Sequence, residues 1–238
     1  MQSRLYIDEI RVKTDLPQSE CYAFSLPAFT GFSEISFKKN VTFIVGENGS
    51  GKSTLLEAIA VAAGFNPEGG TKNFCFSSRD THSNLHNYFT LLRRRYPQDG
   101  FFLRSETFYN VASEIDDLGV VNSYGGLSLH RQSHGESFIS LICNRFAGRG
   151  LYILDEPEAA LSPSRQLSLL CRIHELAEQD SQFIISTHSP ILMAYPDADI
   201  YQLSEEGIKE IPYWETEHYT LMKAFINSPE KFLEELFR

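Results

Sequence analysis

The sequence predicts an α/β fold built around a mainly parallel sheet, and three apolar segments carry that prediction. Val41–Val45 is a largely apolar run that leads directly into a glycine-rich turn and then into a helix-forming stretch. Leu151–Leu154 is a second run, closed by the carboxylates Asp155 and Glu156, which is typical of a central parallel strand that delivers acids to the carboxyl edge of a sheet. A third apolar run begins at Phe183 and also ends in polar residues.

The turn after the first strand is the most specific motif in the chain. Residues 46–53 read Gly-Glu-Asn-Gly-Ser-Gly-Lys-Ser and fit G-x-x-x-x-G-K-[ST] in full, between a strand and a helix as a phosphate-binding loop requires. Glycines let the backbone curl so that successive N–H groups face phosphate oxygens, and the helix N-terminus adds positive potential. The residues expected to bind a nucleoside triphosphate are Gly46, Glu47, Asn48, Gly49, Ser50, Gly51, Lys52, Ser53 and Thr54.

Hydrolysis of a triphosphate also needs a metal ion, a group that orients the attacking water, and charge stabilisation at the γ-phosphate. We expect Ser53 and Asp155 to hold Mg²⁺, whose shell is usually completed by phosphate oxygens and water. The expected catalytic residues are Lys52, Glu156 and His188. Lys52 reaches the β- and γ-phosphates, Glu156 orients or deprotonates water, and His188 donates to the γ-phosphate from the end of a separate strand.

Composition restricts the class of protein. The chain of 238 residues carries 21 basic and 31 acidic residues, a formal net charge of −10, which argues against a general polyanion binder because non-specific nucleic-acid affinity comes mainly from Lys and Arg. No apolar run approaches the ~18 residues that a membrane span needs, and the N-terminus lacks the apolar region of a secretory signal. The four cysteines have no C-x-x-C spacing. We expect a cytoplasmic protein without membrane insertion.

The remaining segments predict an edge and an insertion around the core sheet. Alternation over Leu5–Val12 and the short stretch Ile35–Phe37 predict antiparallel strands laid at the edge. Residues 66–147 predict an inserted, mainly helical subdomain, within which Leu85–Tyr96 has helical spacing. No heptad pattern is kept up in this insertion, so it leaves no room for a long coiled-coil arm.

The order and types of these motifs resemble the ATP-binding-cassette (ABC) ATPases, and within them the soluble SMC-like branch and its small predicted AAA-family ATPases. Gly46–Ser53 matches the Walker A motif, and Leu151–Glu156 matches Walker B with its catalytic glutamate. Glu158–Ser162 occupies the place of the D-loop, and His188 occupies that of the switch histidine. The resemblance covers most of the chain and implies one ATPase domain over residues 1–238, with ATP and Mg²⁺ as its ligands.

Two family elements are altered in this sequence. The signature, usually Leu-Ser-Gly-Gly-Gln, is represented by Gln132–Glu136 and keeps only Ser133 and Gly135. In the family this element binds the γ-phosphate of the ATP held by the opposite subunit, so the resemblance implies a head-to-tail homodimer in which Ser133 and Gly135 bind nucleotide. The glutamine that normally touches Mg²⁺ has no clear counterpart; Glu106, with Arg104 beside it, is the candidate metal ligand in that place.

These features predict an ATPase whose Mg-dependent ATP binding and hydrolysis drive dimerisation, and which acts on an unknown protein or nucleic-acid partner, as in DNA repair or defence systems. The alternative is the ATPase subunit of an ABC transporter with separate membrane subunits. A small phosphate-loop kinase is a further enzymatic rival, but the paired Asp155 and Glu156, with the later His188, favour hydrolysis. A module that binds ATP without hydrolysing it is disfavoured by the presence of Glu156.

Overall fold

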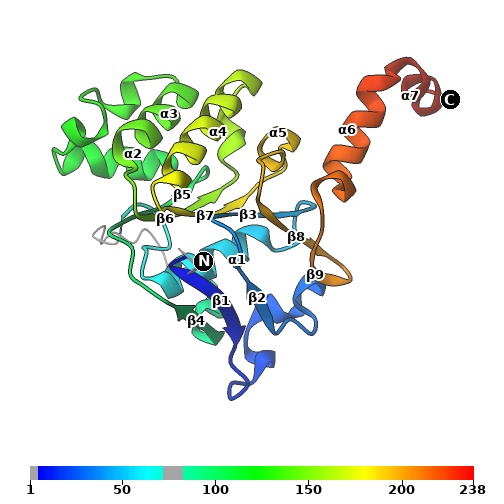
Figure 1. Cartoon of the computed structure of the whole chain (residues 1–238), viewed down its shortest axis with the longest axis horizontal. Helices are drawn as coiled ribbons and strands as arrows, with labels where there is room; N and C mark the ends of the chain where they lie inside the picture. Colours follow the sequence, from blue (N-terminus) through cyan, green and yellow to red (C-terminus); the bar gives the residue numbers. More distant parts are fainter. Residues whose placement is uncertain (1–4, 72–82) are drawn as a thin grey trace.

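The computed structural model describes residues 5–71 and 83–238 and shows two sheets with helix α1 (Lys52–Ala63) between them (Figure 1). The larger sheet has the strand order β5-β6-β7-β3-β8-β9, in which the first five strands run parallel and β9 pairs antiparallel with β8. Its strands are β3 (Val41–Gly46), β5 (Asp99–Arg104), β6 (Gly150–Asp155), β7 (Gln182–Ser186), β8 (Asp199–Ser204) and β9 (Gly207–Glu210).

The core sheet is covered on both faces and aligns the polar residues that end its strands. Every residue of β3 and of β6 is buried, as expected for central strands of a parallel sheet. At the end of β6, Asp155 is in register with Arg104 of β5 and with Ser186 of β7. The predicted α/β fold with a mainly parallel sheet is therefore confirmed.

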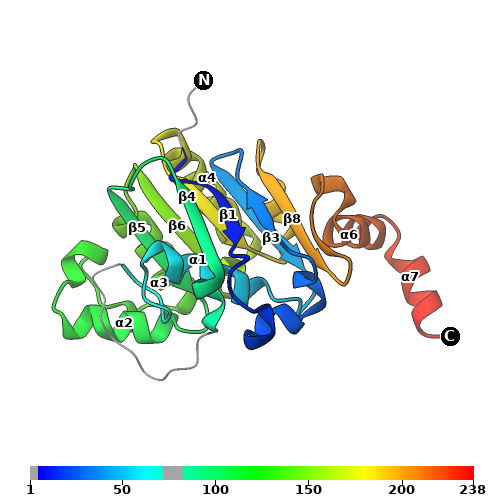
Figure 2. The ribbon, with the colours of Figure 1, turned by 90° about the horizontal axis from the view of Figure 1, so that it is seen from below.

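The smaller sheet is fully antiparallel and has the order β2-β1-β4. Its strands are β1 (Ile7–Val12), β2 (Glu34–Ser36) and β4 (Phe89–Arg93). It lies across α1 from the core sheet, and the apolar core between the two sheets includes Ile10, Leu55, Ile59, Phe102 and Ile184 (Figure 2). The prediction of antiparallel N-terminal strands is confirmed, and the structure adds that they form a separate layer with β4.

Four helices cover the opposite face of the core sheet (Figure 1). They are α2 (Phe108–Asp117), α3 (His134–Arg145), α4 (Pro163–Glu178) and α5 (Pro190–Met193). The second apolar core lies between these helices and the sheet and includes Phe43, Phe101, Phe138, Leu169 and Ile185. The signature helix α3 and the helix α4 that follows Walker B are therefore packed on the same face.

The segment 66–147 contains strands as well as helices. The prediction of a helix over Leu85–Tyr96 is wrong, because a 3-10 turn at Asn84–Tyr88 is followed directly by β4. The backbone of β4 pairs with β1 over its whole length, and this pairing outweighs the local helical spacing. β5 then enters the core sheet, so that α2 and α3, after residue 104, supply the helical part of the insertion.

Helices α6 (Glu217–Asn227) and α7 (Pro229–Leu236) end the chain and extend away from the body (Figure 2). Neither contains a buried residue, and Ile226 of α6 and Leu236 of α7 are 67% and 70% exposed. No helix in the described part of the chain combines the length and the apolar character needed to cross a membrane.

Candidate active site

The phosphate-loop segment joins the end of β3 to the start of α1 and is packed tightly against its neighbours. Gly46 and Gly51 have positive φ angles of 148° and 100°. A Cβ on Gly46 would lie 2.4 Å from the carbonyl oxygen of Leu203, and a Cβ on Gly51 would lie 2.6 Å from the ring of Phe29. Glycine is required at both positions, and the surrounding chain thereby holds the loop in its curled form.

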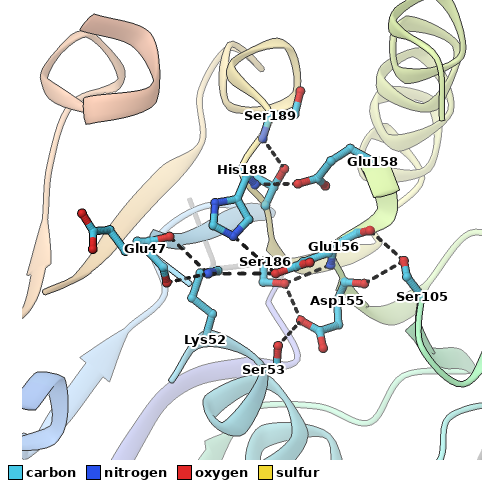
Figure 3. Close-up of polar contacts among 12 residues, drawn as sticks. Glu47, Lys52, Ser53, Ser105, Asp155, Glu156, Glu158, Ser186, His188 and Ser189 are labelled. Carbon is cyan, nitrogen blue, oxygen red and sulfur yellow. Dashed lines mark hydrogen bonds and ion pairs between the residues drawn. The ribbon is translucent and has the colours of Figure 1, made fainter. Parts of the chain in front are cut away.

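Lys52 opens α1, and its side chain is only 4% exposed. Its ammonium donates to the carbonyl oxygens of Gly46 at 3.1 Å and of Glu47 at 3.0 Å, so it lies inside the curl of the loop (Figure 3). Burial lowers the pKa of Lys52, and the carboxylate of Glu156, 4.0 Å away, opposes that shift. A cation directed into a curl of backbone N–H groups is suited to bind phosphate.

Asp155 lies at the centre of the site, at the carboxyl end of β6. One of its carboxylate oxygens accepts hydrogen bonds from the hydroxyls of Ser53 at 3.1 Å and of Ser186 at 2.5 Å (Figure 3). Its other oxygen lies 3.9 Å from the guanidinium Nε of Arg104. Burial raises the pKa of Asp155, while the bond from Ser186 and the charge of Arg104 oppose that rise. The structure therefore brings together the two oxygen donors expected to hold Mg²⁺.

Glu156 follows Asp155 but leaves the strand in a left-handed backbone conformation, with φ 49° and ψ 54°. Its N–H donates to the carbonyl and to the hydroxyl oxygen of Ser186, at 3.1 and 3.0 Å. The side chain is 37% exposed, with its Oε1 at 4.0 Å from Nζ of Lys52 and 3.4 Å from Nε2 of His188 (Figure 3). Left-handed backbone at a non-glycine residue is uncommon and is found preferentially at functional sites.

His188 follows β7 and faces Glu156. Its backbone N–H donates to the carboxylate of Glu158 at 2.5 Å, and its Nδ1 lies 3.0 Å from Nε2 of His218, a residue of α6. The pKa of His188 is lowered, first by burial and then by the charge of Lys52, so the ring is neutral at pH 7. Burial also raises the pKa of the Glu158 carboxyl group.

Glu106, the predicted metal ligand, lies apart from the Ser53–Asp155 pair. Its side chain is 83% exposed and contacts Arg104 at 3.6 Å. Arg104 is bound more closely to Glu57 of α1, at 2.6 Å, and also faces Asp155. At this end of β5 it is therefore the guanidinium of Arg104, and not the Glu106 carboxylate, that faces the carboxylate of Asp155.

The signature segment lies at the start of α3. Ser133 is the N-cap of this helix, and both its hydroxyl (2.6 Å) and its backbone N–H (3.1 Å) donate to the carboxylate of Glu136. Gly135 is buried, and a Cβ there would lie 2.7 Å from the carbonyl oxygen of Ala160 and 2.5 Å from Arg165. Ser133 is exposed and faces none of the Walker residues among the contacts of the described chain. The two predicted signature residues thus lie at the start of α3, apart from the Walker residues of the same chain.

A cavity of about 630 Å³ lies beside the phosphate loop. Residues 46–50 form one wall, and Pro27, Ser204 and Lys209 contribute to the others, with His218 at its margin. Its volume is within the range of ligand pockets and is suited to the base and sugar of a nucleotide held by the loop.

The contacts of several site residues were not predicted from the sequence. Ser186 and Glu158 belong to the predicted third strand and to the predicted D-loop, but their contacts follow from the strand register and from the 3-10 turn Pro157–Ala160. The Arg104–Glu57 pair joins two elements far apart in the chain. His218 is a lone histidine on an amphipathic helix, and only the fold brings it to His188.

Comparison with known proteins agrees with these motifs. A family model described as an AAA domain matches residues 26–111, and a second, described as "AAA domain, putative AbiEii toxin, Type IV TA system", matches residues 123–194. Over 78 residues the chain is 35% identical to an uncharacterized ABC transporter ATP-binding protein of Haemophilus influenzae. These matches support a P-loop ATPase of the ABC type. The matched stretch is 32% of this chain and only 30% of that relative.

A solved structure with the same fold comes from an ABC transporter. CbiO1 from Clostridium perfringens, part of the ABC transporter complex cbiONQ, aligns over 97% of this chain and 100% of its own, with a TM-score of 0.51 and 16% identity. The SMC head domain from Thermotoga maritima aligns over 87% of this chain and 99% of its own, with a TM-score of 0.48 and 16% identity.

Proposed function

We propose that this ABC-type ATPase binds Mg-ATP on the Walker residues and hydrolyses it in a site that a second copy of the chain completes. The observation that supports this most strongly is the position of the Glu156 carboxylate. It lies between the ammonium of Lys52 and the imidazole of His188, beside the Ser53–Asp155 pair. This arrangement supports the proposal that a water-activating carboxylate, two phosphate-binding donors and a metal site act together at one edge of the sheet.

The residues of the loop fit a triphosphate. Lys52 occupies the curl with its ammonium on two carbonyl oxygens, and the buried hydroxyl of Ser50 has no hydrogen-bond partner among the described residues. Ser53 and Asp155 would hold Mg²⁺, which when bound neutralises charge on the phosphate oxygens. In this arrangement Lys52 binds the phosphates and His188 donates its Nε2–H toward the γ-phosphate.

Glu156 is the general base of the proposed reaction. It accepts a proton from a water molecule whose oxygen attacks the γ-phosphorus, the bond to the β–γ bridging oxygen breaks, and ADP and phosphate are released. Its left-handed backbone turns the carboxylate toward Lys52 and His188, whereas Asp155 turns toward Ser53. The two neighbouring acids thus serve different partners.

The second copy is proposed because the signature residues of one chain do not meet its own Walker residues. Ser133 lies exposed at the N-terminus of α3, where backbone N–H groups and the helix dipole favour an anion. In a head-to-tail homodimer this end would face the γ-phosphate bound by the opposite subunit. ATP would then contact both subunits only in the closed dimer, and its binding would shift the monomer–dimer equilibrium.

The closed dimer would act on a protein or nucleic-acid partner in the cytoplasm. The acidic net charge of −10 favours a protein, or a nucleic acid bound through a local patch. The second candidate is an ATPase subunit that serves separate membrane subunits, which the name of the Haemophilus influenzae relative favours. Pull-down with an ATP-trapped variant separates the two candidates, because the transporter function requires an integral membrane protein among the captured partners.

Glu156→Gln tests the proposed chemistry. The amide keeps the size of the side chain but cannot accept the proton, so hydrolysis should fall by about 10²- to 10⁴-fold while ATP binding remains. With Mg-ATP, size-exclusion chromatography with light scattering should show a stable dimer. Glu178→Gln, an exposed residue at the end of α4, is the control and should match the native protein.

A Glu156→Gln protein that stays monomeric at saturating Mg-ATP would contradict the two-copy site. Native hydrolysis rates in this variant would contradict the role of Glu156 as the base. The two measurements are independent, so either part of the proposal can fail alone.

A further inference from the structure

The imidazole rings of His188 and His218 are in direct contact, although 30 residues separate them in the chain. Nδ1 of His188 lies 3.0 Å from Nε2 of His218, and the ring centroids are 5.1 Å apart at an interplanar angle of 60°. The other nitrogen of His188, Nε2, faces Glu156 at 3.4 Å. Both ring nitrogens of His188 therefore face a defined neighbour.

The neighbours of the two nitrogens are the basis on which the protons are assigned. Nε2 of His188 lies 3.4 Å from a carboxylate oxygen, which can only accept, so the hydrogen is placed on this nitrogen, which has no hydrogen-bond partner among the described residues. Nδ1 of the neutral ring is then bare and must accept, and its neighbour, Nε2 of His218, must donate. The pair is consistent when both histidines carry their hydrogen on Nε2.

The charges around the pair favour two neutral rings. His188 faces Lys52 of α1 and Glu156, which follows β6, and its backbone N–H donates to the carboxylate of Glu158. His218 has Glu217 beside it on α6. Two adjacent imidazolium ions close to a buried lysine would repel one another. A neutral His218 can donate through Nε2 without adding charge to the site.

The start of α6 holds His218 in place. Thr216, with 1% exposure, caps the helix: its hydroxyl oxygen accepts from the N–H of Tyr219 at 3.3 Å and donates to the carbonyl of Tyr213 at 2.7 Å. The Tyr213 hydroxyl in turn donates to the carbonyl of Pro190, two residues beyond His188, at 3.0 Å. The position of His218 is therefore tied to the same segment that carries His188.

We propose that His218 is a positioning residue for hydrolysis: its Nε2–H bond to Nδ1 holds His188 in the tautomer and orientation that present Nε2–H to the γ-phosphate. The inference rests on the proposed role of His188. It assigns a function to the first turn of α6 and makes this turn part of the hydrolysis site. An outer hydrogen bond that fixes a histidine ring is typically worth 10- to 100-fold in activity in metal sites.

His218→Phe and His218→Gln are the informative pair. Phenylalanine keeps a ring at the position but has no donor, so kcat should fall about tenfold with the KM for ATP nearly unchanged. Glutamine offers an amide N–H to Nδ1 and should recover most of that loss. His174→Phe is the matched control, because His174 is exposed on α4, hydrogen-bonds only Tyr195 within the described chain, and lies outside the site.

Long-range ¹H–¹⁵N NMR of histidine-labelled native protein provides a readout that does not depend on hydrolysis. Both rings should be neutral at pH 7.5 with their hydrogens on Nε2, and His218→Phe should change the Nδ1 shift of His188. A hydrogen on Nδ1 of His188, equal kcat in His218→Phe and His174→Phe, or no recovery in His218→Gln would each overturn the proposal. Absence of hydrolysis in the native protein would instead overturn the proposed function, and the NMR tautomers would still decide the role of His218.

Discussion

The phosphate loop and the signature segment of this chain satisfy their polar groups in different ways. The side chain of Lys52 is buried at 4% exposure, and its ammonium is held by carbonyls of its own loop, 4.0 Å from the carboxylate of Glu156, which follows β6. The hydroxyl and N–H of Ser133 are exposed and are both taken by Glu136, three residues further along the same helix turn. The groups around Lys52 come from several elements of the fold, whereas those that bind Ser133 come from a single turn of α3.

This difference indicates which half of the proposed ATP site a single chain can form on its own. Asp155, Ser53 and Ser186 come from three elements and are already in contact, so nucleotide and metal meet a prepared site. In the proposed dimer, a phosphate would replace the Glu136 carboxylate on Ser133, and Arg165, 3.2 Å from Glu136, would hold the displaced carboxylate. The second half is therefore expected to bind only when another copy delivers the phosphate.

The largest expected effect is that of Lys52→Ala on the Walker half. Removing the only ammonium that reaches into the curl of the described loop should weaken ATP binding by about 100-fold or more. Isothermal titration calorimetry measures this directly, with Lys13→Ala, on the opposite sheet, as the control. Native affinity in Lys52→Ala would show that the loop does not bind the phosphates through this residue.

Ser133→Ala should have a smaller effect, confined to the signature half. Binding of ATP to the monomer should stay native, while hydrolysis falls about tenfold or more because one donor to the γ-phosphate is lost. Loss of the N-cap should also lower the free energy of unfolding by about 1 kcal/mol.

Mixing Ser133→Ala with Lys52→Ala gives the sharpest test of the two halves. A mixed dimer contains one intact site, with Walker residues from the first variant and the signature from the second, so the mixture should hydrolyse ATP faster than either variant alone. Additive rates on mixing would contradict a site shared between copies.

The smallest expected effect is on the pH dependence of the free energy of unfolding, to which the Walker half and the signature half contribute in different pH ranges. Burial lowers the pKa of His188 below its ordinary 6.5, so acidification protonates the unfolded chain first and the free energy of unfolding should begin to fall below pH 6.5. The bonds from Ser133 lower the pKa of Glu136 below 4.5, so its stabilising contribution is present above pH 4.5 and is lost as pH falls further.

Urea titrations at a series of pH values check this separation. His188→Asn should remove part of the slope just below pH 6.5, and Glu136→Gln should remove part of the slope below pH 4.5. An identical pH profile in native protein and both variants would contradict the assignment.

The sequence alone predicted the site residues that belong to a contiguous motif or stand at the end of a strand. The Walker residues follow from a contiguous motif between a strand and a helix, and Asp155 and His188 follow from strand ends, which parallel pairing brings to one edge. The strand β4 was missed because its helical spacing is overruled by pairing with β1. His218 was missed because nothing in an amphipathic helix distinguishes a histidine that faces the site from one that faces solvent.

Gly135 connects the two halves within one chain. Its missing side chain allows the start of α3 to lie against the carbonyl of Ala160, the last residue of the 3-10 turn Pro157–Ala160. The same turn carries Glu158, whose carboxylate accepts the N–H of His188 at 2.5 Å. In a dimer built as proposed, displacement of α3 by one nucleotide would be transmitted through this turn to the histidine of the other site. Such contact predicts cooperative hydrolysis, with a Hill coefficient above one for ATP.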